Sequence, residues 1–300
     1  MRKLYNNPSL LLFILFIPFL LSACQSRSVS ASSSENVPAS IAELTIESDG
    51  SRMPGLAYLA SGSDPHPTVL LLHGYPGNEK NLDVAQALRR NGWNVVFFHY
   101  RGAWGSEGDF SFRNAENDVQ VVLNYMRDPL NAKALRIDPQ GISIVGHSMG
   151  GHMAVAGILD NPNVRCAIAY DGANMGAKGN GLFSDPKAAA MWSSYSDSLY
   201  MLRGWSGAKA MQEIKQYGTQ LDLVTRANKI NGRPVLLIAA DTNVIPIELH
   251  VKPLLTALSA TANSNAHYLL IDDDHSFSSS RLELIDATQK FLNHRCRERQ

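Results

Sequence analysis

The residues most suited to covalent chemistry lie at 146–151, where the sequence reads GHSMGG directly after the apolar run GISIV. This segment fits the pattern Gly-x-Ser-x-Gly, in which a sharp strand-to-helix turn exposes the serine oxygen above a sheet. Glycines permit a turn too tight for side chains, and a helix N-terminus beneath favours negative charge on the reacting oxygen. Such short patterns also arise by chance, so the strand before it and the helix after it are what predict Ser148 as a nucleophile.

A serine hydroxyl needs a neighbouring base to take its proton. Of the nine histidines, His275 directly follows the apolar run HYLLI, and the carboxyl ends of parallel strands are where such sites assemble. We therefore predict His275 as the base; the alternative is a surface histidine among acidic residues. The acid that steadies the imidazole is expected after the preceding run PVLLIA, at Asp241. Asp272, Asp273 and Asp274 are rivals, but they lie too near His275 in the chain to face its far nitrogen easily.

The oxyanion of acyl transfer needs two N–H donors in a dry site. The main chain of Met149, which follows the predicted nucleophile, should supply one. The segment HGYPG after the run TVLLL should supply the other from Tyr75, because Pro76 has no N–H. We expect His73 to form a local hydrogen bond that shapes this loop; the alternative for the segment is an ordinary Gly/Pro turn.

Apolar runs alternate with helical patterns along most of the chain, which predicts a mostly parallel sheet with helices on both faces. The expected strands are 41–47, 56–61, 68–72, 94–100, 141–145, 166–170, 234–239 and 267–271, and the expected helices are 79–91, 114–127, 149–159, 248–259 and 280–292. The stretch 172–233 has no convincing strand and is too long for a loop. It predicts an inserted helical lid, with helical patches at 185–193 and 208–228. Its apolar side chains either line an acyl site or pack the lid; they are Met175, Met191, Trp192, Met201, Leu202, Trp205 and Met211.

These segments together resemble the α/β-hydrolase superfamily, and the resemblance runs from about residue 41 to 293. LLLHGYPGNEKN, FFHYRGAWGSEGDFSF, GHSMGG and DDDHSFSSSR look like the branch of prolyl-oligopeptidase-type and acylaminoacyl-peptidase-like hydrolases. The resemblance implies an α/β-hydrolase fold and acyl transfer through an acyl-enzyme. It carries over Ser148, Asp241 and His275 as a triad, with Tyr75 and Met149 as oxyanion donors.

The sequence departs from the family's pattern in two ways, one at the predicted acid and one that concerns the substrate. The superfamily often places its acid four residues before a proline, a position that Thr242 occupies here, one residue after Asp241. No acidic pair suited to gripping a peptide N-terminus is recognisable. Esterase activity is therefore expected at least as much as peptidase activity.

The N-terminus resembles the signal of bacterial lipoproteins. Arg2 and Lys3 precede an apolar run at 10–21, and LSAC ends at Cys24. We expect residues 1–23 to be a cleaved signal, Cys24 to carry lipid, 24–40 to be a Ser-rich tether, and 41–300 to be the hydrolase domain. This predicts a membrane anchor in the cell envelope, on the outer membrane if the organism is Gram-negative. A plain secretory signal or an uncleaved helix remains the alternative.

Composition narrows the partners. The chain has 300 residues, 45% of them hydrophobic and 18% charged, with a net charge of +0, which does not favour nucleic-acid binding. No pair of Cys or His residues has zinc-site spacing, so neither a metal nor a cofactor is expected. We expect Cys166 to be a buried strand residue and Cys296 to lie in a polar tail; a disulfide between them is possible but not favoured.

Three functions remain open at this point. The favoured function is a serine hydrolase acting on a small-molecule or peptide acyl substrate. A non-catalytic binding protein on the same scaffold is a second, since a fold does not fix a function. Acyl transfer to an alcohol, or perhydrolysis, by the same triad is a third. The oligomeric state is left open.

Overall fold

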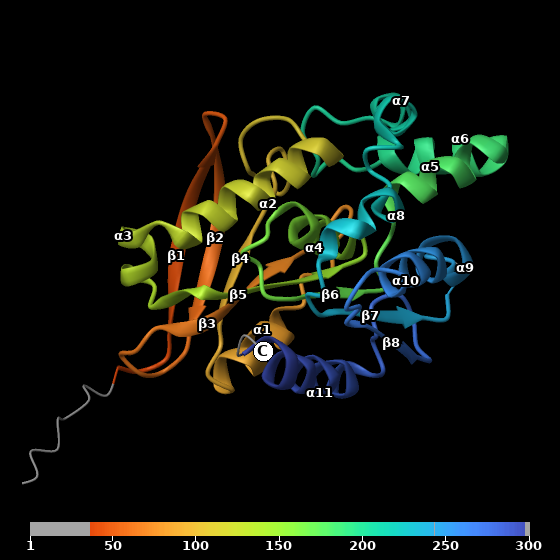
Figure 1. Ribbon diagram of the computed structural model, residues 1–300. Helices are drawn as coiled ribbons and strands as arrows, with labels where there is room; N and C mark the ends of the chain where they lie inside the picture. Colours follow the sequence, from red (N-terminus) through yellow and green to blue (C-terminus); the bar gives the residue numbers. More distant parts are fainter. Residues whose placement is uncertain (1–36, 243, 298–300) are drawn as a thin grey trace, which may run out of the picture. The chain divides into compact units, whose positions relative to one another are not determined.

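The computed structural model describes residues 37–242 and 244–297. Its strands are β1 (Ser40–Ser48), β2 (Ser51–Leu59), β3 (His66–Leu72), β4 (Asn94–Phe98), β5 (Ile137–His147), β6 (Ala167–Tyr170), β7 (Val235–Ala240) and β8 (Ala266–Ile271). Within the described residues they form one sheet in the order β1-β2-β4-β3-β5-β6-β7-β8 (Figure 1). Every neighbouring pair from β4 to β8 is parallel, which confirms the predicted sheet.

The antiparallel edge of the sheet comes from a hairpin. β1 and β2 pair along their whole length, and β2 pairs antiparallel with β4. Asp49 and Gly50 form the turn and have φ values of 46° and 70°. Positive φ at both central residues is typical of the tight turn that matches the twist of a hairpin.

Helices cover both faces of the sheet (Figure 1). One face carries α1 (Leu82–Arg90) and α11 (Arg281–Phe291), and the other carries α2 (Phe112–Arg127), α4 (Met149–Asp160) and α10 (Lys252–Ser259). The strand β3 shows how the sheet divides the interior, because successive side chains of a strand point to opposite faces. Val69 and Leu71 pack into the core under α1 and α11, whereas Leu70 and Leu72 pack into the core under α2 and α4.

Between β6 and β7 the chain is helical, as the sequence predicts. This lid contains α5 (Met175–Ser184), α6 (Pro186–Asp197), α7 (Gly207–Tyr217), α8 (Leu223–Arg226) and the short turn η1 (Ala227–Ile230). Shorter helices also flank β5 and α10, namely α3 (Pro129–Ala134) and α9 (Ile247–His250). No helix in the described ranges is both long and apolar enough to cross a bilayer.

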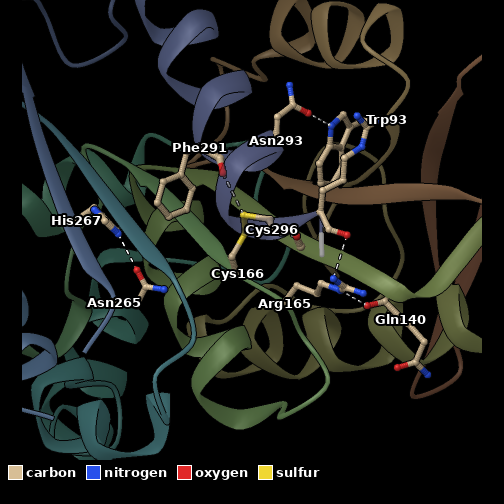
Figure 2. The surroundings of a disulfide bond; sticks show 11 residues. Trp93, Gln140, Arg165, Cys166, Asn265, His267, Phe291, Asn293 and Cys296 are labelled. Atoms are coloured by element: carbon tan, nitrogen blue, oxygen red, sulfur yellow. Dashed lines mark hydrogen bonds between the residues drawn. A yellow bond between two sulfur atoms is a disulfide. The ribbon is translucent and has the colours of Figure 1, made fainter. Parts of the chain in front are cut away.

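A disulfide joins Cys166, just before β6, to Cys296, at the end of the turn η2 (Leu292–Cys296) that continues α11 (Figure 2). Their Cα atoms are 5.7 Å apart, and both side chains are buried. Cys166 is buried, as the sequence predicts, but the disulfide that the sequence did not favour is present, and Cys296 is buried with it. Trp93 Nε1 donates to Asn293 Oδ1 at 3.0 Å, and this bond also fastens the turn η2, which contains Cys296, to the rest of the protein.

Candidate active site

Ser148 lies between β5 and α4, at the turn that the sequence predicts. Its φ and ψ are 58° and −119°, a conformation that a non-glycine residue adopts only when its surroundings impose it. The turn is close-packed: a Cβ on Gly146 would lie 1.9 Å from the carbonyl oxygen of Gly150. Glycine is therefore required where the strand turns into the helix, and the turn holds the serine above the end of β5.

His275 lies in the loop after β8, and its partner is a carboxylate that the sequence reasoning missed. Its Nδ1 is 2.5 Å from Oδ2 of Asp171, at the carboxyl end of β6. The Asp171 side chain is fully buried, whereas 22% of the His275 side chain is exposed. A carboxylate in this position fixes the tautomer of the ring, with the proton on Nδ1 and the lone pair on Nε2.

Asp171 is itself held rigidly. Its φ is 40°, and its main-chain N–H donates to the carbonyl of Ile238 at 2.6 Å. Its Oδ1 accepts a hydrogen bond from the N–H of Ala240 at 3.2 Å, so each carboxylate oxygen has its own partner. Backbone strain of this kind persists only where the surroundings over-determine it, and it clusters at functional sites.

Asp241, the predicted acid, is not at the imidazole. It follows β7, one strand further along the sheet, and its side chain is exposed and makes no hydrogen bond to His275 in the described part of the chain. The correction has a simple origin. Asp171 also follows a predicted strand directly, so the rule that selected Asp241 selects Asp171 equally well. The carboxylate that contacts His275 follows β6 instead of β7.

The neighbouring acidic residues shape the loop instead. Asp274 Oδ1 accepts the main-chain N–H groups of Ser276 and Ser278, each at 2.9 Å. Asp273 Oδ2 accepts those of Ser279 and Ser280 at 2.9 and 2.7 Å. These carboxylates hold the segment between His275 and α11 in place, which is why neither turns toward the ring.

The predicted oxyanion loop lies against the serine. A Cβ on Gly74 would come within 2.9 Å of the Cβ of Ser148, so this close approach requires glycine. The main-chain N–H groups of Tyr75 and Met149 have no hydrogen-bond acceptor within the described residues, which leaves both available to a ligand. His73 makes the predicted local contact, with Nδ1 2.9 Å from the carbonyl of Gly74. Burial lowers the pKa of His73 to about 3, so the ring is neutral.

The side chain of Tyr75 connects this loop to the lid. Its hydroxyl accepts a hydrogen bond from Trp205 Nε1 at 2.7 Å and donates to Ser196 Oγ at 2.8 Å. Its ring packs near Phe112 and Trp192, with ring centroids 5.5 and 6.2 Å away. Burial raises the pKa of Tyr75 to about 12, so the hydroxyl stays protonated. Trp192 and Trp205 therefore pack the lid onto the loop, which is one of the two roles that the sequence predicts for the apolar side chains of the lid.

A cavity of about 610 Å³ lies at the start of α2 and along α7, and Trp205 is one of the residues that line it. Its charged side chains already have partners: Arg101 contacts Asp118 and Asp49, and Glu213 accepts the N–H groups of Phe112 and Arg113. No group of three or more His, Cys, Asp or Glu side chains in residues 37–242 and 244–297 is arranged to hold a metal ion.

The parts assembled around Ser148 are those of acyl-group chemistry. A serine lies at a strained turn, an imidazole is oriented by a buried carboxylate, and two main-chain N–H groups have no acceptor among residues 37–242 and 244–297. Such a set can generate an alkoxide nucleophile and stabilise an oxyanion. Residues 1–23 and Cys24, the predicted signal and lipidation site, lie outside the described residues.

The chain belongs to the Alpha/beta hydrolase family, whose model matches residues 69–287. That match begins within β3, ends within α11 and includes Ser148, Asp171 and His275. Membership in this family supports a hydrolase.

Two relatives are similar over parts of their length. A lysophosphatidylserine lipase ABHD12 from Danio rerio is 32% identical over 100 residues, covering 32% of this chain and 24% of the relative. A probable 1-alkyl-2-acetylglycerophosphocholine esterase from Arthroderma benhamiae is 22% identical over 249 residues, covering 73% of this chain and 62% of the relative. This chain thus spans less than two thirds of either relative.

Solved structures share the fold at low sequence identity. The esterase Pf2001 of Pyrococcus furiosus has a TM-score of 0.62 and 16% identity, covering 86% of this chain and 93% of that one. An acylaminoacyl peptidase of Pyrococcus horikoshii has a TM-score of 0.66 and 15% identity, covering 88% of this chain and 43% of that one. At such identities the likeness establishes the α/β-hydrolase fold alone.

Proposed function

We propose that this protein is a serine hydrolase that cleaves carboxylic esters through an acyl-enzyme, with Ser148 as nucleophile, His275 as base and Asp171 as the acid. One observation carries the proposal: the 2.5 Å contact between His275 Nδ1 and the buried Asp171 Oδ2, beside a serine at a strained strand-to-helix turn. Asp171 replaces Asp241 in the triad first expected. The two relatives described above are a lipase and a probable esterase, which favours an ester over a peptide.

The reaction would proceed in two halves. Ser148 Oγ attacks the acyl carbon while its proton passes to His275 Nε2, and Asp171 stabilises the resulting imidazolium. The N–H groups of Tyr75 and Met149 would hold the oxyanion. Collapse breaks the bond to the leaving group, which takes the proton from His275. A water molecule then gives its proton to His275 and attacks the acyl carbon, and collapse releases the acid and returns the proton to Ser148.

The test is labelling of the purified protein with a fluorophosphonate probe. We expect the wild type to be labelled and Ser148→Ala to be unlabelled. Ser194→Ala, at an exposed lid serine, is the matched control and should be labelled as the wild type is. A folded wild type that resists the probe and hydrolyses no p-nitrophenyl ester would support a non-catalytic scaffold instead. Labelling that survives Ser148→Ala would place the nucleophile elsewhere.

We also propose that the enzyme is anchored to the cell envelope through a lipid on Cys24. The support is the sequence alone: a basic start, a short apolar run and a small-residue site ending in Cys24. Labelled palmitate fed to bacteria that express the full chain should be incorporated into the wild type and not into Cys24→Ser. Incorporation into both proteins would contradict the assignment.

A further inference from the structure

The ring of His147, the residue before Ser148, touches His275 in two ways. Its Nε2 lies 2.7 Å from the main-chain carbonyl oxygen of His275. Its ring also packs against the His275 ring, with centroids 4.6 Å apart and planes tilted by 43°. The side chain is buried, with 4% of the residue exposed, so these contacts are shielded from water.

The protonation of His147 follows from its partners. A carbonyl oxygen only accepts, so Nε2 must carry the proton and donate it. The other nitrogen, Nδ1, is buried and has no hydrogen-bond partner in the described part of the chain. Burial, and then the charge of the neighbouring His275, lower the pKa of His147 to about 3. The ring is therefore a neutral donor throughout the pH range in which a histidine base can work.

We propose that His147 is a positioning residue, whose imidazole holds the main chain and ring of His275 at the distance from Ser148 that proton transfer requires. This inference rests on the proposed function. His147 and Ser148 are consecutive, so one dipeptide would contact the base at its carbonyl, at its ring face and at its reactive nitrogen. Fixing these points on one dipeptide leaves little freedom in the distance between the serine oxygen and the imidazole.

The other contacts of His275 do not supply this restraint. Asp171 holds Nδ1, on the opposite side of the ring from the nitrogen that must face the serine. Asp274 and Arg281 hold the loop beyond His275, through the N–H and the carbonyl of Ser276. Asp171, Asp274 and Arg281 are also the charged groups around this pair of rings. Among the residues that the structure describes, His147 supplies the side chain that hydrogen-bonds to the main chain of His275 itself. A misplacement of about 1 Å costs on the order of 100-fold in rate.

Three variants separate the hydrogen bond from the ring. In His147→Gln the side-chain amide nitrogen can occupy the position of Nε2 and donate to the same carbonyl. In His147→Asn the shorter side chain places its nitrogen near the position of Nδ1 and cannot reach that carbonyl. His147→Phe keeps a ring and loses the donor. We expect kcat for a short p-nitrophenyl ester to stay within about 3-fold of the wild type in the Gln variant, and to fall about 10- to 100-fold in the other two.

The pH profile gives a readout that packing alone would not move. If the His275 ring is held less firmly, its hydrogen bond to Asp171 is weaker, so Asp171 stabilises the imidazolium less. The midpoint of the acid limb of kcat/KM should therefore move to lower pH in the Asn and Phe variants and stay unchanged in the Gln variant. KM should remain within about 2-fold in all three, because His147 does not face the substrate. Unchanged kcat and midpoint in the Asn and Phe variants would overturn the proposal, and so would equal losses in all three variants together with lowered Tm.

A measurement without substrate separates this inference from the proposed function. The proton shared by His275 and Asp171 should give a downfield NMR resonance in the wild type and in the Gln variant. It should broaden in the Phe variant through faster exchange with water. If the resonance behaves in this way but Ser148 is never labelled, the proposed hydrolase function fails while the positioning stands. If Ser148 is labelled and the resonance is equally sharp in all variants, the positioning role is refuted.

Discussion

His275 Nδ1 and Asp171 Oδ2 are 2.5 Å apart although the two residues are separated by 104 positions in the chain. They follow β8 and β6, strands with β7 between them. The loop after β8 therefore reaches across the end of β7 to place the imidazole. Asp241, which follows β7 itself, is left facing solvent.

Replacing the buried carboxylate should abolish most activity. We expect Asp171→Asn to lower kcat about 10³- to 10⁴-fold, because the amide favours the wrong tautomer and cannot stabilise the imidazolium. Asp241→Asn is the matched control and should keep kcat within about 2-fold. The measurement is steady-state hydrolysis of a short p-nitrophenyl ester. The reverse ranking of the two variants would restore Asp241 as the acid.

Removing one hydroxyl should disturb the oxyanion loop. Tyr75→Phe keeps the partly buried ring but loses the hydrogen bonds to Trp205 and Ser196. We expect kcat to fall about 3- to 30-fold, because the loop that presents the Tyr75 N–H loses its link to the lid. Tyr195→Phe, whose ring is half exposed and also contacts Tyr75, serves as the control. Equal rates in both variants would show that the lid does not set the loop.

The disulfide should stabilise the fold with little effect on catalysis. Cys166 and Cys296 are 130 residues apart, and by loop-closure entropy a cross-link of this length contributes about 4 to 5 kcal/mol at most. The double variant Cys166→Ala/Cys296→Ala should unfold at a lower urea concentration and keep its kcat. Adding dithiothreitol should shift the wild-type transition toward that of the variant and leave the variant unchanged. A wild type insensitive to reductant would contradict a role for this bond in stability.

The free energy of unfolding should decrease in mild acid, because two buried histidines stay neutral in the folded protein. His73 and His147 have pKa values of about 3 in the folded protein because they are buried, against an ordinary value of 6.5. Below pH 6.5 the unfolded chain binds protons there and the folded chain does not, so stability falls as pH falls toward 3. Each histidine contributes a slope of roughly 1.4 kcal/mol per pH unit within this window.

The free energy of urea unfolding measured at half-unit intervals from pH 7 to 5 tests this expectation, since most carboxylates remain ionised in that range. His294→Ala, at an exposed histidine, should not alter the slope. A stability that stays flat over this range would show that the buried rings accept protons without unfolding.

Periodicity was sufficient to predict the sheet because the buried strands are continuous apolar runs, as parallel strands covered on both faces must be. The helices were predicted less sharply. The expected helix at 248–259 is two helices in the structure, α9 and α10, because Pro253 starts a new helix and cannot continue the one before it. The short helix α3 has Pro129 in its first turn and Asp128 as its cap, which together are a start signal too local for a search by period.

The site was predicted as far as local sequence determines it. Ser148, His275, Tyr75 and Met149 are placed by turns that the sequence itself marks, and the structure brings them to one end of the sheet. The carboxylate that contacts His275 could not be chosen in this way, because Asp171 and Asp241 both follow predicted strands. What decides between them is how far the loop after β8 extends, and that depends on its packing. The partner of Cys166 depended in the same way on where the last helix docks.

The Cys166–Cys296 bond turns the final stretch of the chain into a closed covalent ring that contains the lid, Asp171 and His275. A protease that cuts the exposed lid once, for example after Tyr200, would open this ring without releasing either piece. The cut protein would run as one species on a gel without reductant and as two with it. The protein could thus lose a peptide bond in its lid and keep His275 and Ser148 in one molecule.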